Sequence, residues 1–332
     1  MAEVHIVNVA PGDCTIIRHN SGRCTVMDIC CGNSEASIKS FGLLKALEEL
    51  STNKPGGNFR MCEYTSNPIK YLQGIGVNIV HRFILSHPDM DHMDGLKRLH
   101  DEIGIINLWD TGYRRTNSKP TFGAGYNRYK EEDWLFYEDV IDGVVPGVTP
   151  LIKHAGARFE SANLPAERHD GLHILAPDDR LLVDPNEHDD INESSYIIQY
   201  NSSAGNIILP GDAHDESWKQ VLSNRNLANN CSFLLAPHHG RDSKRSYDFL
   251  DHLRPKLTVL GCSPSKHLAY DEWTRRGLEF ITSNQAGNIV LELKDNAYDV
   301  YIENRNYAEA CNRDLSIRNK QGYYYWKTII NG

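Results

Sequence analysis

The sequence lacks a hydrophobic run that could cross a membrane, and its N-terminus lacks the features of an export signal. No apolar run among the 332 residues reaches the roughly 18 that a membrane-spanning helix needs. The stretch from Met1 to Val7 has neither a basic segment nor a long apolar core, so a signal peptide is not expected. These absences predict a cytoplasmic protein without a membrane partner.

The sequence also lacks any C-x-x-C pair, although it contains eight cysteines. Such scattered spacing is typical of neither a disulfide framework nor a zinc ribbon, so we expect reduced thiols. The adjacent pair Cys30-Cys31 has no cysteine partner at ligand spacing, which favours packing beside a turn over chemistry. The other cysteines are Cys14, Cys24, Cys62, Cys231, Cys262 and Cys311.

Positive charge is in deficit, with 35 Lys and Arg against 44 Asp and Glu and a formal net charge of −9. This balance argues against a broad basic surface for nucleic acid. It does not exclude a nucleic-acid or nucleotide substrate, because bound metals and one local basic segment can supply positive charge.

Short apolar runs that end in polar residues are the main pattern present. Strands followed later by helices occur in both halves of the chain, which predicts an α/β protein. The expected strands are 4–9, 14–17, 25–29, 83–85, 172–175, 196–200, 206–209, 232–236, 257–260 and 288–293, and the expected helices are 36–50, 68–74 and 215–222.

The densest group of candidate ligands follows the strand at 83–85. His87, Asp89, Asp91 and His92 fall within six residues, and Pro88 disfavours helix at His87, so these side chains lie on a turn. Imidazoles and carboxylates crowded on one turn are costly unless a cation binds them. The turn therefore predicts a divalent metal.

Two further strand ends carry the same chemistry. Asp212 follows the strand at 206–209, and His238-His239 follow the strand at 232–236. One Gly-Asp is usually a turn, and one His-His-Gly is usually a surface feature. Three such junctions in this order indicate ligands that converge from rigid strand ends.

The chain resembles the metallo-β-lactamase superfamily, and more specifically the hydrolase domain of ComEC-type DNA-uptake proteins and their free-standing relatives. The resemblance covers roughly residues 3 to 295 and implies a four-layer αββα sandwich with the metal site at one edge of the two sheets. It predicts a hydrolase domain over 1–300, an insertion at 110–170 and a packed tail at 301–332. The matching motifs are V-x-x-G-D (Val9 to Asp13), Met27-Asp28, S-H-P-D-x-D-H (Ser86 to His92), N-x-x-S (Asn192 to Ser195), G-D-A (Gly211 to Ala213), H-H-G (His238 to Gly240), Lys266-His267 and Gly287-Asn288-Ile289.

The resemblance also implies two divalent metal ions, zinc or manganese. His87 and Asp89 would bind the first ion, and Asp91 and His92 the second, with Asp212 bridging both. His238 or His239 would complete the second site, His238 being favoured. Asn192 stands where the first ion's third ligand is expected, and His173 and His188 are alternatives. The aspartates make the site harder than an all-imidazole one, so manganese competes with zinc.

Catalytic roles follow from that ligand set. Two cations lower the pKa of a shared water from about 16 towards roughly 7. Asp91 or Asp212 could orient this water. Lys266 or His267 could bind a phosphate oxygen or protonate the leaving group, unless they form only an exposed polar turn.

Residues 113–130 combine basic and aromatic side chains and contain no acid. Arg114 and Arg115 predict a lid over an anionic substrate, since arginine pairs with phosphate and tyrosine stacks on bases. The alternative is a solvated loop whose charges pair with the acids from Glu131 onward. The aromatic tail at 321–330 predicts a last strand covering a sheet edge, or a docking surface.

The resemblance favours a phosphodiesterase or nuclease acting on DNA, RNA or a nucleotide, with a role in bacterial phage defence as a further expectation. Another ester, a thioester or a lactam is the first alternative substrate. A metal-stabilised sensor or interaction subunit, with a protein partner from the same operon, is the alternative from a different class.

Overall fold

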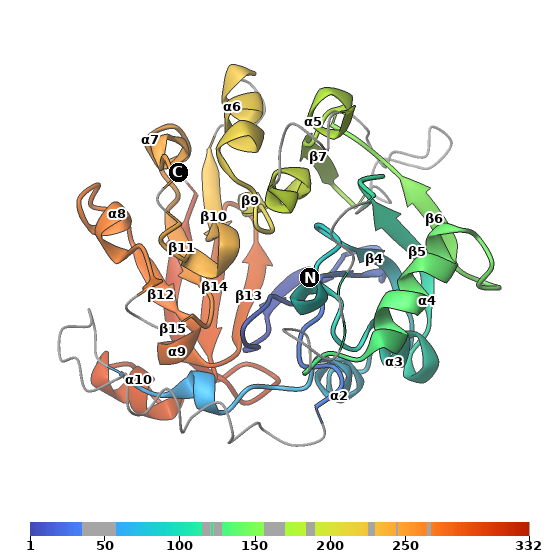
Figure 1. Ribbon diagram of the computed structural model, residues 1–332. Coiled ribbons are helices and arrows are strands. Elements are labelled where there is room, and N and C mark those ends of the chain that lie inside the picture. The colour runs from blue at the N-terminus through green and yellow to red at the C-terminus, as the bar shows by residue number, and fades with distance from the viewer. Residues whose placement is uncertain are drawn as a thin grey trace.

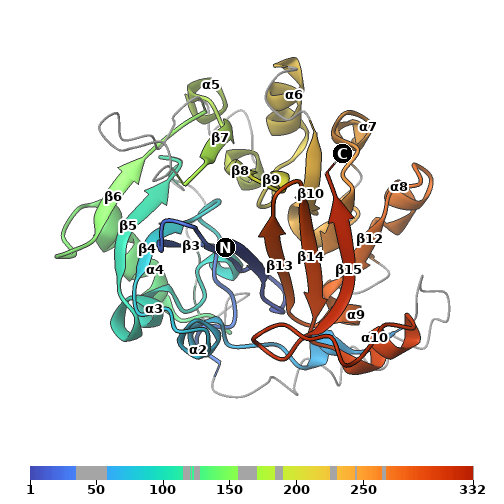
Figure 2. The same ribbon diagram turned by 180° about the vertical axis from the view of Figure 1, so that it is seen from behind.

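Two β-sheets face each other and helices cover both outer sides (Figures 1 and 2). The computed structural model describes residues 1–34, 58–114, 120, 122, 128–155, 170–183, 190–224, 230–243, 245–263 and 267–331. The helix expected at 36–50 lies outside these residues.

The first sheet has nine strands in the order β15-β14-β13-β1-β2-β3-β4-β5-β6. Neighbours from β15 to β3 pair antiparallel, and β3 to β6 pair parallel. The strands are β1 (Glu3–Ile6), β2 (Thr15–Arg18), β3 (Cys24–Met27), β4 (Val80–Ile84), β5 (Ile105–Asp110), β6 (Thr149–Ile152), β13 (Ile289–Lys294), β14 (Ala297–Ile302) and β15 (Tyr324–Ile330).

The second sheet has six strands in the order β12-β11-β10-β9-β8-β7. Strands β9 to β12 pair parallel, so their C-terminal ends meet at one edge, while β7 and β8 join antiparallel. The strands are β7 (Leu172–Ala176), β8 (Ile197–Ser202), β9 (Gly205–Leu209), β10 (Cys231–Leu235), β11 (Leu257–Leu260) and β12 (Phe280–Thr282).

The helices are short, and their local sequences explain where they begin. Helix α2, for example, starts after Asn67, whose side chain accepts from the amides of Ile69 and Lys70, with proline at the first helical position. The helices are α2 (Pro68–Gly74), α3 (Leu96–Glu102), α4 (Glu131–Ile141), α5 (Asp179–Val183), α6 (Asp215–Ser223), α7 (Asp248–Leu253), α8 (Tyr270–Thr274), α9 (Ser283–Ala286) and α10 (Arg305–Ala310), with single 3-10 turns η1 (Met61–Glu63), η2 (Met90–His92), η4 (Ile191–Ser194) and η5 (Pro237–Gly240).

Three apolar clusters define the layers. The central cluster joins both sheets through residues such as Val4 and Leu291 of the first and Phe233 of the second. A second cluster packs α2, α3 and α4 on the outer face of the nine-stranded sheet. A third packs α6, α7 and α8 on the six-stranded sheet. This order of helices, sheet, sheet and helices confirms the predicted four-layer αββα arrangement.

The segment 110–170 and the C-terminal tail both contribute regular secondary structure. Within 110–170, helix α4 packs against α3, and β6 forms the edge of the nine-stranded sheet. In the tail, β15 pairs with β14 and buries Trp326, so it forms the other edge. The limits of the hydrolase domain stay a prediction. No helix among the described residues is long and apolar enough to cross a membrane.

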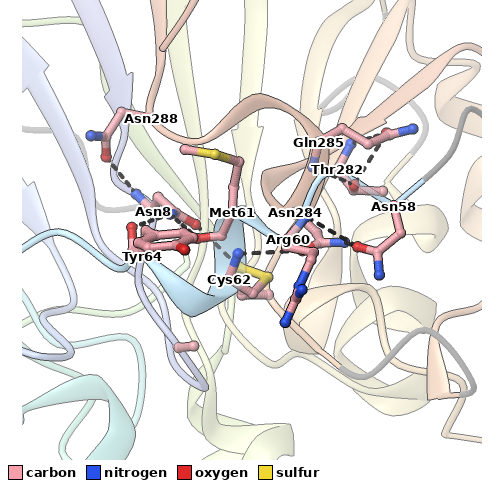
Figure 3. Close-up of a disulfide and its surroundings, with 12 residues drawn as sticks. Asn8, Asn58, Arg60, Met61, Cys62, Tyr64, Thr282, Asn284, Gln285 and Asn288 are labelled. Carbon is pink, nitrogen blue, oxygen red and sulfur yellow. Dashed lines mark hydrogen bonds between the residues drawn. A yellow bond between two sulfur atoms is a disulfide. The ribbon is translucent and has the colours of Figure 1, made fainter. Parts of the chain in front are cut away.

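The expectation of eight reduced thiols is wrong for one pair. Cys62 and Cys262 form a disulfide although 200 residues separate them in the sequence (Figure 3). Sequence spacing could not reveal this pair because the contact joins η1 to the loop after β11. The chain around Cys62 is fixed there, since the side chain of Asn8 donates to the carbonyls of Met61 and Tyr64. The remaining six cysteines are free, and Cys30 and Cys31 are buried beside a turn.

Candidate metal centre

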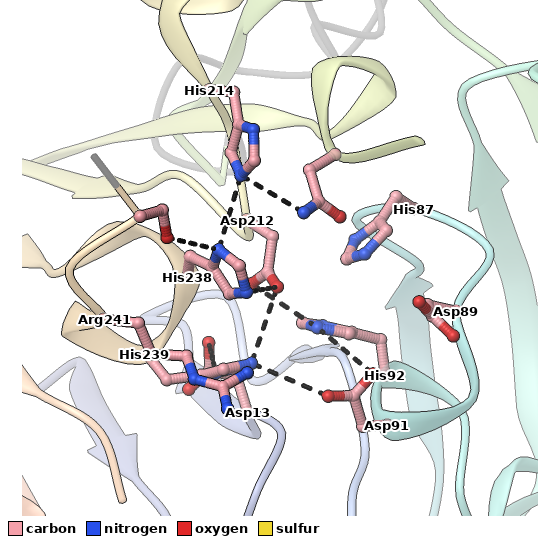
Figure 4. Close-up of polar contacts among 12 residues, drawn as sticks. Asp13, His87, Asp89, Asp91, His92, Asp212, His214, His238, His239 and Arg241 are labelled. Atoms are coloured by element: carbon pink, nitrogen blue, oxygen red, sulfur yellow. Dashed lines mark hydrogen bonds and ion pairs between the residues drawn. The ribbon is translucent and has the colours of Figure 1, made fainter. Parts of the chain in front are cut away.

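The three strand-to-loop junctions meet at one edge of the two sheets (Figure 4). The first lies between β4 and α3, where Asp89 accepts from the amide of Met90 at 2.7 Å and so begins the turn η2. The second follows β9 at Gly211, and the third follows β10 at η5. Gly211 has φ of 52°, and a Cβ there would lie 2.6 Å from Cβ of Ser86. Only glycine lets these two loops approach so closely.

Five of the predicted ligands form a compact buried cluster. Nε2 of His92 lies 3.5 Å from Oδ1 of Asp212 and 3.9 Å from Oδ1 of Asp91. Nε2 of His239 lies 3.5 Å from Oδ2 of Asp212 and 3.7 Å from Oδ2 of Asp91. The ring of His87 stands 4.3 Å from that of His92. Among these five residues two overlapping ligand groups result, His87/His92/Asp212 and Asp91/His92/His239, and a third group joins Asp212 and His239 to Asp13. In each group the ligand atoms lie within 4.8 Å of one another.

The cluster contains buried polar atoms that the protein itself does not satisfy. Nε2 of His92, Oδ1 of Asp212 and Nε2 of His239 are all buried and have no hydrogen-bond partner. Such atoms cost about 1–3 kcal/mol each when left unpaired. A divalent cation coordinated by these nitrogens and oxygens would remove the penalty, and the mixed donor set suits zinc or manganese. The residues therefore fit a divalent metal.

The charges within the cluster support the same interpretation. Burial lowers the pKa of His92, but Asp212, Asp28 and Asp91 outweigh burial and raise it well above its usual value. His239 behaves alike, and its pKa rises to about 10. Asp212 is also buried, but the nearby histidines hold its pKa well below the usual range. Protons on imidazole thus balance the carboxylates without metal, and a bound cation replaces them.

Two further carboxylates orient the ligating histidines from behind. Nδ1 of His92 donates to Oδ2 of Asp28 at 2.9 Å, and Nδ1 of His239 lies 3.0 Å from Oδ2 of Asp13. Each contact turns Nε2 towards the cluster, the usual arrangement behind a metal-binding histidine. The sequence showed both aspartates only as parts of motifs, without this role.

Gly12 explains why a glycine precedes Asp13. A Cβ at Gly12 would lie 1.7 Å from the backbone oxygen of Asp91, so no larger residue fits there. The segment that carries Asp13 is therefore pressed directly against the turn that carries Asp91.

Asp89 and His238 are predicted ligands that belong to none of the ligand groups among the described residues (Figure 4). Nε2 of His239 faces both Asp91 and Asp212, whereas Nε2 of His238 lies 3.7 Å from Oδ2 of Asp212. On the other side of the His238 ring, Nδ1 lies 3.3 Å from Nε2 of His214. Which of the two histidines is the ligand stays a prediction.

His214 is a residue at the site that the sequence interpretation missed. Its Nε2 lies 3.1 Å from Nδ2 of Asn192, and its Nδ1 contacts Asp190. Asn192 thus reaches the rim of the cluster through His214. The sequence feature that could have indicated His214 is its position two residues after Asp212, in Gly-Asp-Ala-His.

The remaining predicted residues are not brought to the cluster or cannot be placed. Arg114 donates to Oδ2 of Asp110 at 2.5 Å and lines a cavity of about 580 Å³ with Pro88, the residue after His87. His267 is exposed, and neither it nor His173 belongs to a ligand group among the described residues. Lys266, Arg115 and His188 lie outside the described residues.

Neither a protein family nor a curated protein matches the sequence. Among solved structures, the chain is similar to Igni18, a metallo hydrolase from the hyperthermophilic archaeon Ignicoccus hospitalis KIN4/I, at 11% identity and a TM-score of 0.47, covering 88% of this chain and 100% of that one. It is similar to the metallo-beta-lactamase fold protein YhfI from Bacillus subtilis at 9% identity and 0.46, covering 88% and 100%. It is similar to a diphosphatase of the PhnP family at 12% identity and 0.43, covering 89% and 98%. Because these TM-scores are below 0.5, the likeness carries no argument about this chain, and its fold rests on its own strand order.

Proposed function

We propose that the protein is a metal-dependent hydrolase that cleaves phosphate esters, most specifically phosphodiesters in nucleic acid or nucleotides. One observation carries the proposal: His87, Asp91, His92, Asp212 and His239 converge in one cluster, in which Nε2 of His92, Oδ1 of Asp212 and Nε2 of His239 are buried without hydrogen-bond partners. A purely structural cluster of this kind would satisfy its own polar atoms. A metal centre leaves them free for the ion.

The protein's side chains would divide the work between holding the metal and handling the substrate. A bound divalent ion supplies Lewis acidity and makes water nucleophilic near neutral pH. His87, His92 and His239 supply neutral nitrogen ligands, and Asp91 and Asp212 supply negative charge. The carboxylates also accept hydrogen bonds, so either one can orient a water for attack.

The surroundings of the cluster favour an anionic substrate. Arg245 lies beside His238, with Nη2 2.7 Å from Nδ1 of that ring. Asn192 and His214 lie along the same rim. Guanidinium and imidazole groups next to a metal suit the oxygens of a phosphate ester. The cavity beside Pro88, lined by Tyr113 and Trp134, offers room for an aromatic leaving group such as a nucleoside.

A substrate panel tests the proposal. The metal-stripped protein is reloaded with zinc or manganese and incubated with single- and double-stranded DNA, RNA, cyclic nucleotides, a carboxylic ester and a lactam. Asp212→Asn serves as the inactive variant. Asp295→Asn is its control, because Asp295 is exposed and lies away from the site. It sits in the turn at the end of β13, whereas the start of β13 pairs with the end of β1 that leads to the site.

The outcomes separate the candidate functions. Phosphodiester cleavage that disappears in Asp212→Asn and persists in Asp295→Asn supports the proposal. Cleavage of the ester or lactam alone would show that the substrate class is wrong. A protein that binds metal, cleaves nothing and co-purifies stoichiometrically with a partner would instead be an interaction subunit.

A further inference from the structure

His238 and His239 are adjacent in sequence but face different surroundings. Both have left-handed backbone angles, with φ of 52° and 57°, and their rings are inclined at 73°. His239 is buried within the cluster of ligands, whereas the side chain of His238 is 19% exposed. The kink in η5 therefore sends one imidazole into the metal centre and leaves the other at its rim.

The contacts of His238 fix which of its nitrogens carries the proton. Nη2 of Arg245 lies 2.7 Å from Nδ1 of His238, and Oγ of Ser243 lies 3.1 Å from the same nitrogen. A guanidinium has donors only and stays charged in proteins, so Nδ1 must accept. The proton of the neutral ring then resides on Nε2. That nitrogen has no lone pair left for a metal.

Arg245 is itself held in place from the metal centre. Its Nη1 donates to the carbonyl of Ala213 at 2.8 Å, and Ala213 directly follows Asp212. The guanidinium thus spans from the backbone beside Asp212 to the ring of His238. This geometry makes the orientation of His238 depend on the loop that carries Asp212.

The protonated nitrogen of His238 points to the edge of the cluster. Nε2 lies 3.7 Å from Oδ2 of Asp212, which is too long for a hydrogen bond. This carboxylate oxygen is the acceptor recorded near Nε2 among the described residues, and the side chain is partly exposed, so an incoming ligand can reach the nitrogen. A neutral N–H at this point would meet an oxygen of a molecule bound at the metal centre.

We propose that His238 is not a metal ligand but a fixed hydrogen-bond donor for an anionic oxygen of the substrate, and that Arg245 is the positioning residue that holds it in this form. The inference rests on the proposed phosphate-ester hydrolysis for the identity of that oxygen. The assignment of His239 as ligand and His238 as donor rests only on the geometry.

Paired substitutions distinguish the two histidines by metal content. We expect His238→Ala, loaded with zinc and desalted, to retain the wild-type zinc stoichiometry by elemental analysis, and His239→Ala to lose zinc. With a phosphodiester substrate, His238→Ala should lower kcat/KM about 100-fold, as for loss of one donor to a developing oxyanion. Loss of zinc from His238→Ala would overturn the proposal.

Conservative variants separate a donor from a ligand and from a structural role. His238→Gln places an amide N–H near the position of Nε2 and should recover a large part of the lost activity without changing the zinc content. Arg245→Met should lower kcat at unchanged zinc content, and Arg245→Lys should restore part of it. All variants should unfold within a few degrees of the wild type; equal loss in His238→Ala and His238→Gln would contradict the donor role.

The tautomer can be measured without any substrate. Long-range ¹H–¹⁵N NMR of the zinc-loaded protein should show His238 protonated at Nε2, and Arg245→Met should release this preference. A proton on Nδ1 in the wild type would refute the proposal. If the wild type cleaves no phosphodiester, the proposed function fails, while metal content and tautomer still decide the assignment of the two histidines.

Discussion

The substitution Asp28→Asn gives the sharpest test of the metal centre, because it changes one atom behind a ligand and none within the cluster. Asp28 is buried at 1% exposure and accepts two hydrogen bonds. Oδ1 receives the amide of Ser86 at 2.7 Å, and Oδ2 receives Nδ1–H of His92 at 2.9 Å. Asparagine can keep only one of them. If the NH₂ group of the asparagine faces His92, the proton of that ring moves to Nε2. If the NH₂ group faces Ser86, two donors oppose each other and the hydrogen bond from the amide of Ser86 is lost.

The expected effect follows from the position of His92. Its Nε2 belongs to two of the ligand groups, so a proton placed there competes directly with the metal. Loss of such a carboxylate behind a ligating histidine typically weakens metal binding 10- to 100-fold, which is about 1.4–2.7 kcal/mol. We expect zinc affinity, measured by competition with a chromophoric chelator, to fall by this factor.

Asp94→Asn is the matched control. Asp94 is also a buried carboxylate two residues from His92, but it accepts from the amide of Cys31 and from Asn33 instead of from a ligand. It should lower the free energy of unfolding without changing zinc affinity. If Asp28→Asn binds zinc as tightly as the wild type, or no more weakly than Asp94→Asn, the proposed orientation of His92 is refuted.

Three further predictions concern stability and the approach of the loops. Cys62→Ser should lower the free energy of unfolding by up to roughly 5 kcal/mol in denaturant titrations, because the disulfide spans 200 residues, whereas Cys311→Ser should have little effect; equal effects would contradict this. The pKa of Asp170, raised by burial but lowered more by its hydrogen bonds and neighbouring charges, is about 2 in the folded protein against 3.8. The ionised carboxylate of Asp170 therefore contributes roughly 2 kcal/mol to the free energy of unfolding above pH 4, and this contribution is lost as the pH falls towards 2. The free energy of unfolding of Asp170→Asn should accordingly depend less on pH in this range. Gly12→Ala should weaken zinc binding, since its Cβ would lie 1.7 Å from a backbone oxygen, whereas Gly74→Ala meets nothing within 4 Å and should leave zinc binding unchanged; similar affinities for the two variants would show that the close approach is unimportant.

The sequence predicted those features that depend on neighbouring residues. The strand before His87 and the turn that follows it are local patterns, and so are the runs that end at Asp212 and at His238-His239. The last two converge because β9 and β10 are parallel neighbours in one sheet. The first reaches them from the other sheet, where Gly211 packs against Ser86.

The missed features depend on contacts between distant segments or on a few backbone angles. Cys62 and Cys262 are brought together by the tertiary fold across 200 residues of sequence. The different directions of the His238 and His239 side chains follow from left-handed angles in η5, and no residue type there demands them. Asp13 acquires its role only when its loop reaches His239. Propensity and spacing contain none of this information.

One lone pair limits how two of the ligand groups can be filled together. The groups His87/His92/Asp212 and Asp91/His92/His239 share His92, whose Nδ1 is bound to Asp28, so only Nε2 remains and it can bind a single ion. One ion can therefore draw on His92 together with Asp212. A second ion would need ligands beyond those shared, and Asp89 is the predicted carboxylate that stands outside both groups. Two ions stay a prediction that depends on Asp89, or on substrate oxygens, moving into the coordination sphere; one ion requires no change in the arrangement described.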